Sequence, residues 1–137
     1  MQEIRVRTSA RSEMAEITDQ VQALLDDAGV REGAVVLQSL HTTAALTINE
    51  NADPFVVDDV LRKLDRLIPQ DEPFYKHAEG NSDSHVKTAL VGNSVTLLIE
   101  GGKLVLGRWQ GVYFCEFDGP REREMIVKAV SFDPPRG

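Results

Sequence analysis

The order of apolar and polar positions in the first half of the chain predicts a strand, a helix and a further strand. Apolar and polar residues alternate from Ile4 to Thr8, which is the two-residue period of a strand. Between residues 14 and 28 apolar side chains recur every three or four positions, and this run ends at Gly29, as in an amphipathic helix. Residues 34–48 are rich in Val, Leu, Thr and Ile, so they predict one long strand, or two strands joined by a bulge near His41.

The second half begins with helices and ends in a run of strands. Asp53 and Pro54 are typical of an N-cap and a first helical residue, and the apolar stripe behind them ends before Pro69. After a polar loop, residues 81–84 contain several N-cap candidates for a short helix through Leu90. Alternation and turn residues then predict antiparallel strands at 95–99, 104–106, 109–117 and 125–132.

This order of elements favours an α+β fold. Strands come as a run at the end of the chain and do not alternate regularly with helices, which argues against a doubly wound parallel sheet. A chain of 137 residues is expected to form one domain with a real hydrophobic core. We therefore predict a compact single domain over residues 1–137, built mostly of antiparallel sheet with two longer helices and one short helix.

The charge balance excludes some classes of partner. With 22 acidic and 15 basic residues the formal net charge is −7, which argues against a protein that mainly holds nucleic acid. The apolar stretches are too short for a membrane span, and no signal peptide is visible at the N-terminus. The single cysteine, Cys115, cannot close an internal disulfide and suits a reducing compartment. We expect a soluble, cytoplasmic protein with an inert, buried Cys115.

The excess of acidic residues is concentrated between residues 49 and 85, a segment that contains nine acidic and four basic residues. Asp58, Asp59 and Asp65 are expected on the solvated face of the second helix. The other acids of interest, Glu50, Asp53, Glu79 and Asp83, lie among polar loop residues and are candidates for a cation site.

The three histidines, His41, His77 and His85, are the first candidates for chemistry. Their spacing is a weak metal signal, and each of them also suits a surface or capped histidine. His85 lies near the first turn of its predicted helix, where free N–H groups favour an anion. Segment 79–85 could therefore cradle a phosphate, with positive charge from Lys87 and Arg108, or could be an ordinary turn into a helix.

Two further segments combine polar groups at strand ends. Residues 49–53 join a strand to a helix, and Asp53 there has a complete structural role as N-cap. In segment 107–111 Trp109 is predicted in the core, while Arg108 and Gln110 share the other strand face and could meet a ligand.

Three stretches of the chain, taken together, resemble the YjbQ family. They are His41–Pro54, Glu79–Lys87 and Gly107–Arg121, and they occur in the family's order over nearly the whole chain. The resemblance implies a compact α+β domain that assembles as a homotrimer, and a weak secondary thiamine-phosphate synthase activity on a small phosphorylated substrate. In one respect the chain departs from the pattern, because similar proteins usually carry Thr at the position of Arg108.

The resemblance also implies a polar pocket with a divalent metal ion, Zn or Mg. Metal ligation is expected from His41, His77 and His85, a catalytic role from Glu50, Glu79 and Gln110, and substrate binding from Asn49, Asp53, Ser82, Lys87 and Arg108. The ion would neutralise a pyrophosphate leaving group while the basic groups hold phosphate oxygens. Two alternatives stay open: a non-catalytic metabolite-binding trimer, and a metal-dependent hydrolase with a water activated on zinc.

Overall fold

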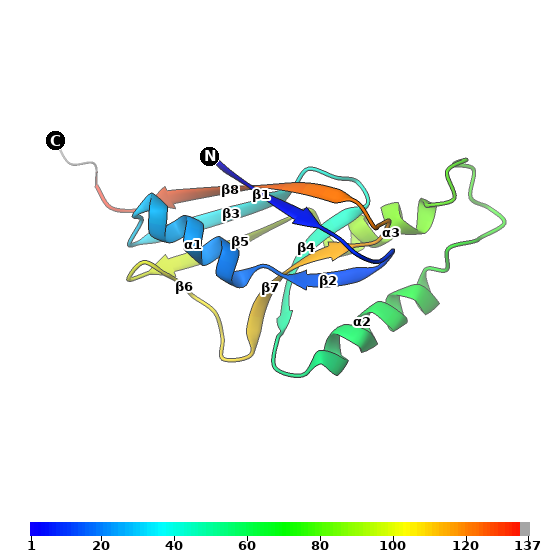
Figure 1. The fold of residues 1–137 in the computed structure, drawn as a ribbon, viewed down its shortest axis with the longest axis horizontal. Coiled ribbons are helices and arrows are strands. Elements are labelled where there is room, and N and C mark those ends of the chain that lie inside the picture. The colour runs from blue at the N-terminus through cyan, green and yellow to red at the C-terminus, as the bar shows by residue number, and fades with distance from the viewer. Residues whose placement is uncertain (135–137) are drawn as a thin grey trace.

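Two antiparallel sheets form the frame of the protein (Figure 1), and the computed structural model describes residues 1–134 of the chain. In spatial order the larger sheet contains β1 (Gln2–Arg7), β8 (Glu122–Ser131), β3 (Gly33–Ser39), β5 (Ser94–Glu100) and β6 (Lys103–Leu104). The smaller sheet contains β2 (Glu13–Glu16), β7 (Gln110–Glu116) and β4 (Ala44–Glu50). The helices are α1 (Thr18–Ala28), α2 (Pro54–Leu67) and α3 (Ser82–Val91). The predicted α+β class is confirmed.

The main core lies between the two sheets and includes the inner face of α1. Val35 of β3, Leu46 of β4 and Phe114 of β7 are fully buried there together with Val21 of α1. The alternation of the strands explains this placement, because every second side chain points to the same face of a sheet. The core therefore follows from the two-residue period of the strands and the stripe of α1.

A smaller apolar cluster covers the opposite face of the small sheet. Its buried members are Ala45, Tyr113, Cys115 and Phe117. Side chains from α2 pack against it only in part, and no residue within α2 itself is fully buried. The long helix α2 thus lies on the outside of the molecule, as Figure 1 shows.

Two predicted elements differ from the structure. Residues 34–48 are not one bulged strand, because β3 and β4 belong to different sheets and residues 40–43 carry the chain from one to the other. The first helix begins at Thr18 and not at Met14, since Glu13–Glu16 pairs with β7 as strand β2. In both places the spacing of apolar residues was compatible with the predicted element and with the observed one. Pairing with a strand distant in sequence decided which of the two forms. None of the helices in residues 1–134 is long and apolar enough to cross a membrane.

Candidate functional site

Helix α3 turns its polar face toward the protein interior. Asp83 and Lys87 are fully buried, and the Lys87 ammonium donates to Asp83 at 3.1 Å and to Asp65 of α2 at 2.6 Å. Arg11, from the connection between β1 and β2, donates to both carboxylate oxygens of Asp83. Burial acts to raise the pKa of Asp83, but the bonds from Arg11 and Lys87 outweigh it and hold that pKa below its usual range. Charge pairs thus fix α3 to two other segments.

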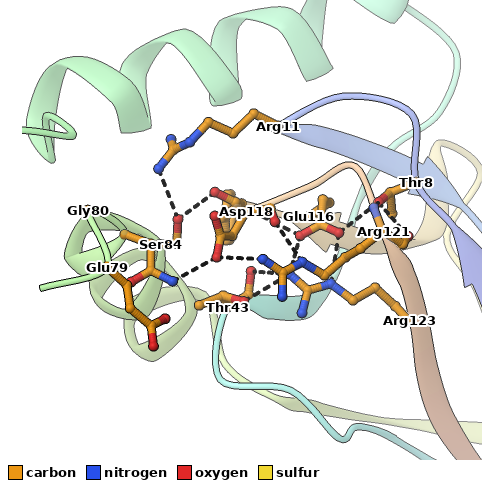
Figure 2. Close-up of polar contacts among 12 residues, drawn as sticks. Thr8, Arg11, Thr43, Glu79, Gly80, Ser84, Glu116, Asp118, Arg121 and Arg123 are labelled. Carbon is orange, nitrogen blue, oxygen red and sulfur yellow. Dashed lines mark hydrogen bonds and ion pairs between the residues drawn. The ribbon is translucent and has the colours of Figure 1, made fainter.

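A second buried ion pair joins the two sheets (Figure 2). Arg123 of β8 donates through Nε to Glu116 of β7 at 2.8 Å, and its Nη2 also binds the same carboxylate. The Thr8 hydroxyl donates to Glu116 at 2.7 Å, and Arg123 donates to the Thr43 hydroxyl at 2.9 Å. Burial acts to raise the pKa of Glu116, but its bonds with Arg123, Asp118 and Thr8 hold that pKa below the usual range. The buried polar groups of this network are hydrogen-bonded to one another, which is typical of a structural ion pair.

Glu116 and Arg123 are not among the predicted site residues, although the sequence pattern contains a signal for their burial. Glu116 follows Val112 and Phe114 at two-residue spacing, so it lies on the core face of its strand. Arg123 is likewise in phase with the buried residues of β8. Opposite charges in phase with core positions on two strands indicate a buried ion pair.

His77 and His85 meet at a hollow at the start of α3. Their ring centroids are 5.4 Å apart with an interplanar angle of 88°, and they line a cavity of about 330 Å³ with Tyr75, Ser82 and Val86. The Glu79 carboxylate lies 3.6 Å from His77 Nε2. An adjoining hollow of about 360 Å³ shares Tyr75, His77 and Ser82 with the first.

The start of α3 lies next to these imidazoles, since its first residue, Ser82, lines the same hollow. The N-cap residue Asn81 makes no side-chain bond to the first turn. Its amide instead donates to Asp118 at 2.7 Å, and its Oδ1 is buried without a partner in the described chain. Imidazole N–H groups and a helix N-terminus are both donors suited to an anion.

His41 belongs to another environment. Its Nε2 accepts a hydrogen bond from the Glu124 backbone N–H at 2.8 Å, and its carbonyl accepts from Asn93. Partial burial and the charge of Arg123 lower the pKa of His41. Because the Nε2 lone pair is engaged by Glu124, that nitrogen is not free to bind a metal ion.

The other predicted site residues gather at the far end of the small sheet, where β4 ends and β7 begins. Glu50 pairs with Gln110 across these strands, and the Glu50 carbonyl accepts from the Tyr113 hydroxyl at 2.9 Å. The Asn51 backbone N–H donates to the Trp109 carbonyl at 2.9 Å. We call residues 105–110, which connect β6 to β7 and include the first residue of β7, the tip segment.

Within the tip segment and beside it, several predicted residues have local roles. Arg108 stacks on the Trp109 ring at 4.8 Å from its centroid. Trp109 is 53% exposed, so its predicted place in the core is wrong. Asn49 accepts from the Glu50 N–H at 2.7 Å, and Asp53 caps α2 through Phe55 at 2.9 Å.

The predicted residues thus fall into two groups in one chain. His77, Glu79, Ser82 and His85 lie around the start of α3, whereas Asn49, Glu50, Asp53, Arg108 and Gln110 lie at or near the end of the small sheet. Lys87 points into the buried charge network and not into the hollow. The roles assigned to these residues stay predictions.

The residues present do not fit the single metal pocket that the resemblance implies. In residues 1–134 no group of three or more His, Cys, Asp and Glu side chains is placed to hold a metal ion. His77 and His85 face each other, but His41 bonds elsewhere. The expectation of one pocket built on His41, His77 and His85 is therefore wrong for the single chain.

The known proteins that this chain resembles belong to one family, and their names state no reaction. The family model described as "UPF0047 protein YjbQ-like" matches residues 2–131. The protein named UPF0047 protein YugU of Bacillus subtilis is 46% identical over 127 residues, covering 93% of this chain and 96% of that protein. UPF0047 protein MJ1081 of Methanocaldococcus jannaschii is 47% identical over 126 residues, covering 92% of this chain and 91% of that protein.

Solved structures agree with the fold. The crystal structure of an uncharacterized conserved protein of the YjbQ/UPF0047 family from Clostridium acetobutylicum has a TM-score of 0.93 and 48% identity, and the match covers 95% of this chain and 100% of that chain. A hypothetical protein from Aeropyrum pernix has a TM-score of 0.90 at 32% identity, covering 95% of this chain and 97% of its own.

These findings correct the expected activity. The names of these relatives state no reaction, and the described residues contain no group of three or more His, Cys, Asp and Glu side chains that could hold a metal ion. The prediction of a thiamine-phosphate synthase-like enzyme with a metal in a His and carboxylate pocket is wrong, and the zinc hydrolase alternative fails with the same pocket. The match over residues 2–131 and the identities above show that the chain belongs to the UPF0047, YjbQ-like family.

Proposed function

We propose that this protein binds a small phosphate-bearing molecule, without a metal ion, in the hollow between His77 and His85. One observation carries the proposal: two imidazoles, with ring centroids 5.4 Å apart, line a cavity of about 330 Å³ at the start of a helix. Imidazole N–H groups and the N–H groups of a helix start both donate to phosphate oxygens. Tyr75 and Ser82 add hydroxyl groups at the same hollow.

The buried charges of α3 support this placement. Asp83 lies in the first helical turn, where a bare carboxylate would repel a phosphate. Arg11 and Lys87 both pair with Asp83, which offsets its charge. The helix start therefore keeps its attraction for an anion despite the acid in its first turn.

Titration with inorganic phosphate and with pyrophosphate tests the proposal. Backbone amide shifts in NMR spectra should map to residues 75–86, and His77→Gln and His85→Gln should each weaken binding by about tenfold, the loss expected for one hydrogen bond to a charged group. His41→Gln is the matched control, since His41 lies outside the hollow. Unchanged affinity in both hollow variants, or an equal loss in His41→Gln, would exclude this site.

The divalent cofactor expected from the resemblance stays a prediction. Within residues 1–134 the two facing imidazoles do not belong to any group of three or more side chains placed to hold a metal ion, so we expect the hollow to bind an ion weakly. We expect EDTA to leave phosphate binding unchanged within about twofold, because the proposed donors are N–H groups. Elemental analysis of the purified protein, together with titration before and after chelation, checks this point.

The homotrimer and the cytoplasmic location are also proposals. Exposed apolar side chains, among them Phe55, Leu67 and Leu90, support burial in an assembly. Light scattering should give a mass three times the 15.2 kDa of one chain. A cytoplasmic location is supported by the free, buried Cys115, whose thiol needs no oxidising compartment.

A further inference from the structure

The outward face of α3 is apolar, which reverses the usual arrangement of a surface helix. Amphipathic helices of single domains normally bury their apolar face and expose their polar one. In α3 the buried residues are Asp83, Ser84, Lys87 and Thr88, while Val86 is 40% and Leu90 69% exposed. Ala89, between them in sequence, is exposed as well. Such a face is expected to be covered by another surface.

This face borders the histidine hollow. Val86 lies one turn before Leu90 on the exposed side of α3, and it lines the hollow together with Tyr75 and His85. A surface that covered Val86 and Leu90 would therefore also reach the open side of the hollow.

The tip segment is the counterpart that the chain itself offers. Trp109 is 53% exposed, with the Arg108 guanidinium stacked on its ring. Its backbone is held by the bond from Asn51 N–H and by a turn in which Gln110 N–H donates to the Gly107 carbonyl at 3.0 Å. The Gln110 side chain closes the same turn by accepting from the Gly107 N–H at 2.8 Å. An ordered, exposed Trp beside an Arg is the composition of an interface anchor.

The two surfaces have complementary charge. Segment 69–80, which walls the hollow, carries three acidic residues and one basic residue, for a formal charge of −2. The tip segment carries Arg108 and no acid, for a formal charge of +1. Opposite potentials favour the contact of these two segments over contact of either with itself.

One chain does not bring these surfaces together. Figure 1 shows the connections at the end of the small sheet and the loop after α2 at different edges of the molecule. The residues that line the hollows come from segments 70–77 and 80–86, without any from the tip segment. Two different patches on identical chains give a head-to-tail contact, which can close into a ring.

We infer that a second copy of this chain seats its tip segment on the outward face of α3, so that the partner's Trp109 covers Val86 and Leu90 and the partner's Arg108 faces the histidine hollow. A guanidinium there would add a charged, planar donor to the imidazoles that bind phosphate. This inference rests on the proposed function for the ligand, whereas the contact between the copies stands on the surfaces alone.

Two variants with opposite defects test the contact. Trp109→Glu damages the tip segment and leaves the α3 face intact, and Leu90→Glu does the reverse. Each variant alone should have the mass of one chain in light scattering. Mixed in equal amounts they should form a heterodimer with one intact contact, and no larger species. Leu98→Glu, on an exposed Leu of β5, is the matched control and should keep the wild-type mass.

The same mixture tests the shared site. It should bind one phosphate per two chains, at the α3 of the Trp109→Glu chain, while each variant alone binds at least tenfold more weakly. Adding His85→Gln to the Trp109→Glu chain should abolish this binding, and adding it to the Leu90→Glu chain should not. If Leu90→Glu loses its circular dichroism signal, Ala89→Glu on the same face replaces it.

The outcomes separate the two claims. Wild-type mass in both single variants, or no heterodimer on mixing, overturns the contact. A heterodimer in which His85→Gln has the same effect in either chain overturns the shared site. If wild-type protein binds no phosphate, the proposed function fails, and the masses of the variants still decide the contact.

Discussion

The role of a single histidine in this protein is decided by what its ring nitrogens contact. All three histidines have the same intrinsic chemistry, yet His77 and His85 face each other at a hollow and His41 accepts a backbone hydrogen bond from Glu124. A neutral ring is required for that bond, because protonated imidazole has no acceptor nitrogen. His41 is therefore a structural residue with a defined protonation state.

This state makes stability depend on pH in a predictable direction. The folded protein lowers the pKa of His41, while in the unfolded chain the pKa is about 6.5. Between these two values the unfolded state binds more protons, so the contribution of His41 is fully present above about pH 6.5 and declines as the pH falls toward the folded pKa. We expect the free energy of unfolding in urea to decrease from pH 7 to pH 5 less steeply in His41→Gln than in the wild type. Equal slopes would show that the ring does not titrate with folding.

Among the elements, α2 and α3 are attached by different forces. Helix α3 is held by buried charge pairs of Asp83 and Lys87, whereas α2 rests on the small sheet mainly through half-buried apolar side chains and adds one ion pair, from Asp65 to Lys87. Burial of apolar area does not depend on one bond, so α2 should tolerate loss of single contacts. Its start is the exception, since the first turn of a helix needs partners for its free N–H groups.

Removal of the N-cap should weaken α2 by a known amount. Asp53 accepts the Phe55 N–H at 2.9 Å, and Pro54 occupies the first helical position. We expect Asp53→Ala to lower the free energy of unfolding by about 1 kcal/mol in urea denaturation. Asp58→Ala, an exposed acid within the same helix, is the control and should change it by less than about 0.5 kcal/mol. If the two variants were equal, Asp53 would contribute through charge and not as a cap.

At the scale of the whole molecule, the ion pair of Glu116 and Arg123 joins the two sheets. Both side chains are fully buried, one on each sheet, and Thr8 and Thr43 complete their hydrogen bonds. A buried pair of this kind adds little over an apolar substitute, but either partner left alone is costly. Loss of either side chain alone should therefore destabilise the packing of the two sheets against each other.

Single and double substitutions should therefore differ. We expect Arg123→Met and Glu116→Gln each to lower the free energy of unfolding by about 3 kcal/mol or more, and the double variant to lose much less than the sum. Arg5→Met, which breaks an exposed pair with Glu3 on β1, should cost less than about 1 kcal/mol. Additive losses in the double variant would indicate that the two groups do not interact.

Sequence patterns alone determined the fold class, the α2 boundary from Asp53 to Ile68, and the inert Cys115, whose burial raises the pKa of its thiol to about 12. Caps, periods and the preference of apolar side chains for the interior act over a few residues, so they can be recognised along the chain. The resemblance of three motifs was likewise enough to predict the family, and the match of the family model to residues 2–131 confirms it.

Only the tertiary structure decided which polar residues meet. The motifs that contain Glu50 and Gln110 lie at one end of the small sheet, and His77 and His85 lie at the start of α3. The separation of residues 34–48 into two sheets, and the bond that occupies Nε2 of His41, depend on strand β8 and its Glu124 N–H, far away in sequence. Contacts between distant segments depend on packing of the whole chain, which local periodicity does not encode.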